Sequence, residues 1–215
     1  MSAKAAAKPA AKGPEPPRRA PTQERARKKV DAILAACGRV LAAEGYEGAT
    51  TSAIAKAAGV PVGTLYEYFP NREAIFSAFL ENTVEQVIEA VARVSPAQMG
   101  KSPSEAVGNL IAVAVHAVSR YRGEMRALLS RIPGALELPA LQQLQGGIAE
   151  IARALSWLDP ETAESKDFER KLYILTNTIF GFFIRLATGP EPPMKPGEIT
   201  RELTSLVLRY LEVEE

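Results

Sequence analysis

The sequence is poor in the residues that build disulfides, metal sites and many catalytic centres. It has one cysteine and one histidine among 215 residues, so neither an internal disulfide nor a zinc site with several thiolate or imidazole ligands is expected. Glycine-rich phosphate loops and the Gly-x-Ser-x-Gly motif are also missing. We therefore expect a protein that is not an enzyme, has no catalytic residues, and uses neither a metal nor a cofactor.

Long apolar runs are missing too. The longest uncharged apolar stretch, residues 172–184, is interrupted by Thr176, Asn177 and Thr178, and it is too short for a membrane helix. The first 20 residues lack the apolar segment of a secretory signal. Because a single cysteine also fits a reducing compartment, we expect a soluble, cytoplasmic protein.

Charge is nearly balanced overall but unevenly distributed. Residues 1–29 contain nine lysines and arginines against two glutamates, whereas the whole chain has a net charge of +1. This basic front indicates either a polyanionic partner or a solubilising tail. Residues 1–21 are rich in Ala, Lys and Pro and have no apolar periodicity, so we expect them to be disordered.

From residue 22 onward the sequence is typical of helix, with neither strand-like alternation nor a hairpin turn. Cys37 lies in an apolar stripe, which predicts a buried structural thiol, and Gly45 is expected to end the first helix. Apolar periodicity, caps and breakers predict helices at about residues 22–44, 51–58, 62–69, 72–94, 102–121, 124–131, 138–158, 161–187 and 196–213. An all-α fold follows.

The segment from residue 50 to 72 has the clearest functional pattern. Two short helices flank a turn at Gly59, and Pro61 stands where the second helix begins. Small residues permit a close crossing of the two helices, while Leu65 and Phe69 supply a miniature core. This pattern is typical of a helix-turn-helix, whose second helix enters the major groove of DNA. An ordinary helical hairpin is the alternative.

The amino-acid motifs of this segment are more specific than its pattern of helices and turns. Over about residues 24–80 the chain resembles the TetR family of bacterial transcriptional regulators, because its motifs match the family signature in order and spacing: Ile54-Ala55, Ala58-Gly59-Val60, Gly63-Thr64-Leu65-Tyr66, Tyr68-Phe69 and Asn71-Arg72-Glu73. The resemblance implies a three-helix DNA-binding domain at residues 22–70. A helical effector-binding and dimerisation domain would then occupy residues 71–215, with a connecting helix at 71–94.

The resemblance also implies which residues contact DNA. Residues at the start of the second helix would bind phosphate, the next helix would read bases, and the last two side chains would again reach phosphate. The full set is Thr51, Ser52, Val62, Gly63, Thr64, Tyr66, Glu67, Tyr68 and Arg72. Because Val62 and Gly63 lack side-chain donors, direct readout would rest on thymine methyl groups. Glu67 either accepts from cytosine or stays in solvent or in an intramolecular pair.

In that family, residues beyond about 80 sense a ligand and form the dimer. The last two predicted helices have wide apolar faces, which either pack on the same pair in a second subunit or are buried within one chain. If Thr176 and Asn177 are buried they need partners, from each other across a dimer or from a ligand. Polar or aromatic residues set in apolar helices are the ligand-site candidates: His116, Met125, Trp157, Tyr173, Asn177 and Phe180.

Together these features favour a ligand-responsive transcriptional regulator, by family default a repressor. It would bind a palindromic operator in double-stranded DNA as a homodimer and be released by a small apolar or amphipathic effector. The alternative is a helical adaptor that uses the same fold to bind protein instead of DNA.

Overall fold

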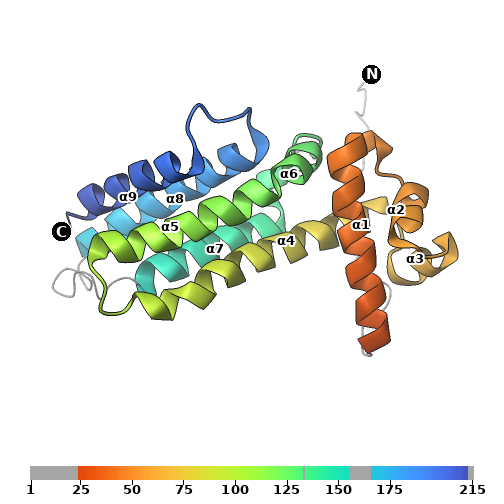
Figure 1. Cartoon of the computed structure of the whole chain (residues 1–215), viewed down its shortest axis with the longest axis horizontal. Coiled ribbons are helices and arrows are strands. Elements are labelled where there is room, and N and C mark those ends of the chain that lie inside the picture. Colours follow the sequence, from red (N-terminus) through yellow and green to blue (C-terminus); the bar gives the residue numbers. More distant parts are fainter. Residues whose placement is uncertain (1–23, 133, 155–165, 213–215) are drawn as a thin grey trace, which may run out of the picture.

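The computed structural model describes residues 24–132, 134–154 and 166–212 (Figure 1). In these ranges the chain is helical and has no strand, so the predicted all-α class is confirmed. The α-helices are α1 (Glu24–Gly48), α2 (Thr51–Ala58), α3 (Val62–Tyr68), α4 (Arg72–Val94), α5 (Pro103–Arg120), α6 (Arg122–Leu129), α7 (Pro139–Ala154), α8 (Lys166–Thr188) and α9 (Pro196–Leu211).

The helix bounds follow the predicted ones closely, with one difference in α1. Helical hydrogen bonding continues to Gly48, past the expected end of the helix, but Gly45 is non-helical with φ 71° and ψ −173°. The backbone therefore does turn where the glycine predicted an end. The tail at residues 1–21, the predicted helix ends at residues 158 and 161, and Trp157 lie outside the described residues.

The helices form a head and a body (Figure 1). The head consists of α1, α2 and α3, and the body consists of α4 to α9. Helices α4, α5, α7, α8 and α9 run along a common long axis, and α1 crosses the end of the body next to the short helix α6. Helix α4 belongs to both parts, because it begins beside the head and then runs along the body.

The head has a small core of its own. Ile33, Cys37, Ile54 and Leu65 are each 0 % exposed. Cys37 is the buried thiol that the sequence predicted, and burial raises its pKa to about 12, so the thiol stays protonated and unreactive. The head is thus held by the packing of aliphatic side chains and of the buried Phe69 ring.

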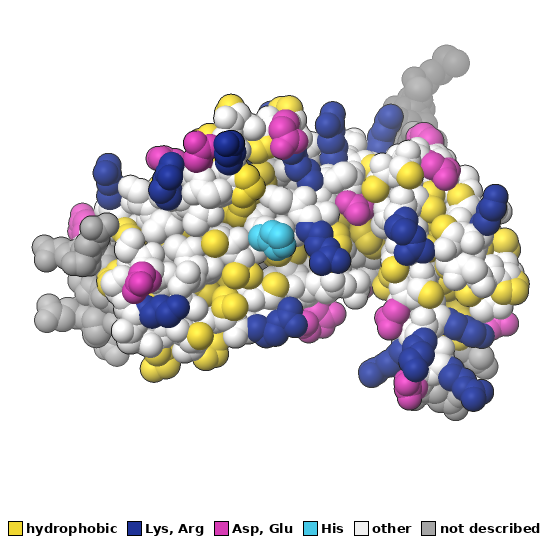
Figure 2. All heavy atoms as spheres, in the orientation of Figure 1, with side chains coloured by type: hydrophobic (Ala, Val, Ile, Leu, Met, Phe, Trp, Pro, Cys, Tyr) yellow, Lys and Arg dark blue, Asp and Glu magenta, His cyan; other side chains and the backbone are white. Residues whose placement is uncertain are grey.

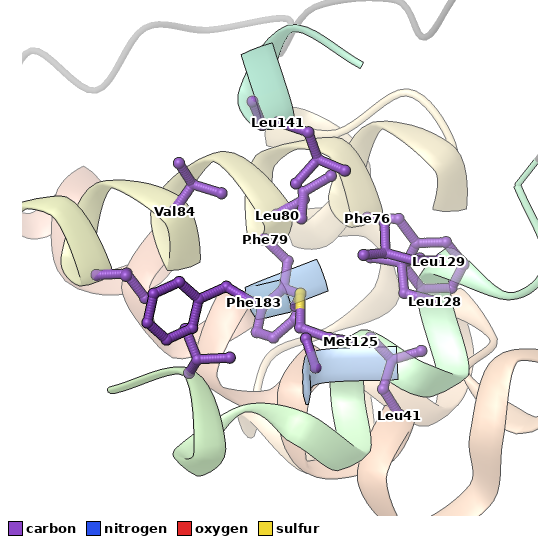
Figure 3. Close-up of a cluster of buried hydrophobic side chains, with 14 of the residues drawn as sticks. Leu41, Phe76, Phe79, Leu80, Val84, Met125, Leu128, Leu129, Leu141 and Phe183 are labelled. Atoms are coloured by element: carbon purple, nitrogen blue, oxygen red, sulfur yellow. The ribbon is translucent and has the colours of Figure 1, made fainter. Parts of the chain in front are cut away.

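A second apolar cluster, called the junction cluster below, joins the head to the body (Figure 3). Leu41 of α1 meets Phe79 of α4, Leu128 of α6 and Phe183 of α8 in this cluster. Gly38 allows the close approach, because a Cβ at this position would lie 2.9 Å from the ring of Phe79. Because α1 packs directly on α4 and α6 in this cluster, a movement of either helix also displaces α1.

In the body, α5 packs on α9 and α7 packs between α4 and α8. Helices α8 and α9 are antiparallel neighbours, since Lys171 near the start of α8 donates to Glu212 after α9 at 2.8 Å. No helix in the ranges given above combines the length and apolar character needed to cross a membrane.

Candidate DNA interface and effector cavity

Local interactions define the helix-turn-helix. The Oγ1 atom of Thr50 accepts a hydrogen bond from the Ala53 amide at 3.1 Å and caps α2. Gly59 ends α2 with φ 69°, a left-handed conformation that is costly for residues with a Cβ. Pro61 precedes α3 as its N-cap and provides no side-chain hydrogen bond to the helix. Asn71 caps α4 by accepting from the Ala74 amide at 2.8 Å.

Helix α3 has an inner face and an outer face. Leu65 is 0 % and Phe69 is 1 % exposed, and these two side chains anchor the helix in the head. On the outer face, Val62 is 38 % and Tyr66 41 % exposed, and Gly63 is exposed as well. Two buried anchors therefore present the start of α3 at the surface, as insertion into a major groove requires.

Two of the predicted DNA contacts lie side by side. Thr51 at the start of α2 and Tyr66 on α3 have their hydroxyl oxygens 3.2 Å apart. This hydrogen bond links the start of α2 to the outer face of α3. Ser52 and Glu67 are also exposed, and Thr64 is half-buried.

Two other predicted contacts have intramolecular roles in the structure. Tyr68 is only 8 % exposed, so its ring belongs to the core of the head. The Arg72 guanidinium lies 4.8 Å from the centre of the Tyr46 ring and 5.4 Å from that of Phe76, and it donates to the Tyr46 carbonyl at 3.4 Å. Arg72 therefore holds α1 against α4, and only part of its side chain is left for a phosphate.

Basic side chains gather on the head at the start of α1 (Figure 2). Arg25, Arg27, Lys28 and Lys29 are exposed there, although Lys28 also pairs with Glu24 at 2.7 Å. The sequence reasoning missed Lys56, which is exposed in the last turn of α2. Its signal was a single lysine within an otherwise apolar helix.

The body contains an apolar cavity of about 130 Å³. Its walls come from α4, α5, α7, α8 and α9, and aliphatic side chains predominate in them. Thr176 is the one polar residue among the described lining residues. Representative members of the lining are Val91, Ile111, Ile148, Leu172, Ile179 and Val207.

None of the predicted ligand-site residues that the structure describes lines this cavity, so their role in binding a ligand stays a prediction. His116 is exposed, because it lies on the opposite side of α5 from Ile111. Tyr173 is 70 % exposed, and it lines a shallow groove between α7 and α8 together with Asn177. Phe180 is half-buried outside the cavity lining.

The two remaining candidates are Met125 and Trp157, of which Met125 is not in the cavity lining. Met125 lines a smaller pocket beside the junction cluster (Figure 3), and Trp157 lies outside the described residues. The predicted ligand-site residues are polar or aromatic groups in apolar helices, whereas the cavity is lined mainly by aliphatic residues, which cannot be told from ordinary core in the sequence. Thr176 is the lining residue that is polar within an apolar helix.

Comparison with known proteins identifies the head. Residues 33–79 match the model of the bacterial regulatory proteins of the tetR family. The fatty acid metabolism regulator protein of Bacillus subtilis (strain 168) is 41 % identical over 63 residues, which are 29 % of this chain and 32 % of that protein. The matched segment thus spans about a third of this relative.

Comparison of structures extends the likeness to the body. The fatty acid degradation regulator FadR of Bacillus halodurans has a TM-score of 0.65 at 20 % identity, covering 84 % of this chain and 94 % of that one. FadR of Bacillus subtilis in complex with stearoyl-CoA has a TM-score of 0.63 at 20 % identity, covering 82 % and 96 %. At this identity the likeness shows the fold alone. The head thus carries a segment that matches the tetR family of bacterial regulatory proteins, and the chain as a whole shares its fold with the regulators named above.

Proposed function

We propose that the protein is a ligand-responsive transcriptional repressor that binds a palindromic operator as a homodimer. The observation that carries the proposal is the exposed start of α3, presented by buried Leu65 and Phe69. Val62, Gly63, Thr64 and Tyr66 would face base edges, and Thr51 and Ser52 would bind phosphate. Arg72, Tyr68 and Glu67 would have lesser roles, because the first two are engaged within the head.

Exposed apolar side chains on the last two helices support a homodimer. Tyr173 and Ile174 on α8 are 70 % and 50 % exposed, and Leu206 and Tyr210 on α9 are 43 % and 39 % exposed. Gly181 on α8 has open space where a Cβ would stand, so a partner helix can approach closely there. Two α8–α9 pairs would form a four-helix interface and place two α3 helices on one operator.

The effector that fits the body is a molecule with a long apolar chain. The cavity lining has no charged side chain among the described residues, and its aliphatic walls favour hydrocarbon. The structural relative from Bacillus subtilis was solved with stearoyl-CoA, which is an acyl chain of this kind. We infer that an acyl-chain derivative is the effector class.

Helix α4 would carry the signal from the cavity to the DNA. Val87 and Val91 line the cavity, while Phe76 and Phe79 near the other end of α4 belong to the junction cluster. A ligand that favours a different position of α4 would also shift the head and change the distance between the two α3 helices. The ligand can lower operator affinity by no more than the ratio of its own affinities for the two positions of α4.

The test is selection of bound DNA from a random library, followed by fluorescence anisotropy with the selected site. We expect a palindromic site, affinity that falls steeply with salt because phosphate contacts release counterions, and release of DNA by dodecanoyl-CoA. Salt-independent or absent DNA binding would contradict the proposal and favour a protein-binding adaptor. DNA binding that no acyl compound changes would contradict the effector class only.

A further inference from the structure

Thr176 differs from other helical threonines of the chain. The hydroxyls of Thr83, Thr178, Thr188, Thr200 and Thr204 each donate to the carbonyl four residues earlier, at 2.7 to 3.0 Å. Thr176 is 6 % exposed, and its Oγ1 atom is buried without a hydrogen-bond partner. A buried hydroxyl without a partner destabilises the fold, so a ligand that supplies the partner is favoured by the same free energy.

The surroundings of Thr176 define the chemistry of that partner. Every other described residue that lines the cavity is apolar, so an ionised carboxylate would lose its hydration there without compensation. A neutral carbonyl oxygen carries a smaller desolvation cost and accepts a hydrogen bond from the hydroxyl. The site therefore selects a neutral acyl carbonyl over a free fatty acid.

Thr176 also lies at the boundary between the cavity and the surface. Thr176 and Leu172 line both the cavity and the shallow groove between α7 and α8. On α7 the groove is lined by the small residues Gly146 and Ala149 together with Gln142, Gln145 and Arg153, and a Cβ at Gly146 would meet open space. The cavity and the groove therefore share part of their lining on α8 at this level.

Two polar bridges between α7 and α8 lie on either side of this shared part of the lining. Gln145 Nε2 donates to Asn177 Oδ1 at 2.9 Å on one side, and Arg153 lies 3.4 Å from Glu169 on the other. Both bridges join α7 to α8, and both are at least partly accessible to solvent. All four of these residues line the groove, so polar groups are available there to contact the polar portion of a ligand.

We propose that Thr176 donates a hydrogen bond to the carbonyl oxygen of an acyl thioester or ester. The acyl chain occupies the cavity, and the polar portion leaves between α7 and α8, along the groove between the two bridges. This inference rests on the proposed function, because it specifies which acyl derivative the effector cavity accepts. Thr176 acts as a specificity-determining residue.

The experiment compares ligands that differ only in the carbonyl oxygen. Dodecanoyl-CoA is paired with S-dodecyl-CoA, and methyl dodecanoate is paired with methyl dodecyl ether. Binding of each to the full chain is measured by calorimetry for the wild type, Thr176→Val and Thr176→Ser. One hydrogen bond predicts that the wild type prefers each carbonyl compound about fivefold to tenfold. The preference should disappear in Thr176→Val and persist in Thr176→Ser.

The two ligand pairs separate the sources of the carbonyl. A carbonyl preference in the CoA pair supports a CoA thioester, and a preference in the methyl pair with no binding of either CoA compound supports a neutral ester. Equal affinities within both pairs, or a preference that survives in Thr176→Val, would overturn the role of Thr176 and leave the proposed effector class standing. If the wild type binds no acyl compound, the effector class fails and this inference fails with it.

Two further measurements keep the inference testable without the carbonyl comparison. Thr176→Val should raise the melting temperature of the free chain by roughly 2–6 °C, because it removes the unpaired hydroxyl; an unchanged or lower value would mean that the hydroxyl is satisfied. Gly146→Leu should slow association of the favoured carbonyl compound about tenfold or more, since the added side chain fills the groove. Unchanged association would place the entrance elsewhere.

Discussion

The head and the body bury their apolar side chains in different ways. In the head, Ile33, Ile54 and Leu65 are completely buried in the small core between α1, α2 and α3. In the body, comparable aliphatic residues surround a cavity of about 130 Å³. A filled core holds a recognition helix in one position, whereas a cavity leaves free energy that a ligand can recover by filling it. The position of the free volume therefore separates the part that reads DNA from the part that senses.

The comparison extends to the surface, where the body is expected to bind its own copy. Leu206→Arg should raise the dimer dissociation constant about a thousandfold, because the isologous interface would bury two unpaired guanidinium groups. Sedimentation velocity over a concentration series measures the change. His116→Arg, on an exposed position of α5, is the matched control and should leave the dimer intact. A variant dimer as stable as the wild type would mean that α9 lies outside the interface.

A second variant addresses the DNA-reading surface of the head. Gly63→Glu should weaken operator binding about a hundredfold, since it places a carboxylate toward the phosphates, while the melting temperature stays unchanged. Gly197→Glu is closely matched, because both glycines are the second residue of a helix and both have open space at the Cβ position. Anisotropy with the selected operator measures both variants. Equal losses of affinity would argue against α3 as the reader.

Filling the cavity should remove the difference between body and head. Ala114 lines the cavity on α5, and Ala114→Phe should weaken binding of the acyl effector about tenfold or more because the ring occupies its space. Operator affinity should be retained, so the variant would repress without responding. Ala112→Phe, on the exposed side of the same helix, should respond normally. The release assay with dodecanoyl-CoA decides, and normal release of Ala114→Phe would place the effector elsewhere.

Helix caps give the smallest expected effects and compare the two parts directly. Thr50 caps α2 in the head, and Ser102 caps α5 in the body with a capping box. Replacement of either residue by Ala should lower the free energy of unfolding by about 1 kcal/mol, as measured by urea denaturation. Only Thr50→Ala should also weaken operator binding, because α2 and α3 are positioned together. Equal operator affinities in the two variants would mean that the head tolerates loss of this cap.

Sequence reasoning was most successful where function depends on local chemistry. The break at Gly59 lies where residue type predicted it, because left-handed backbone depends on a few adjacent residues. The order and spacing of the motifs around α3 were sufficient to indicate the family. The anchoring roles of Leu65 and Phe69 also followed from helical periodicity.

It was least successful for the body. His116 and Tyr173 were chosen because they are polar or aromatic within apolar helices, yet both are exposed. Periodicity shows that a helix has an apolar face but not which neighbour covers that face or how completely. The role of Arg72 was likewise incomplete, because the ring stack with Tyr46 joins residues that are 26 positions apart.

The sequence by itself determined the all-helical class, the helix-turn-helix and the buried state of Cys37, since these follow from periodicity, caps and turn residues within short windows. Only the tertiary structure decided where five helices leave a cavity, that Thr176 lines it without a hydrogen-bond partner, and that a groove between α7 and α8 lies beside it. The physical reason is that free volume and hydrogen-bond satisfaction are properties of several helices packed together. No single helix contains the information that specifies them.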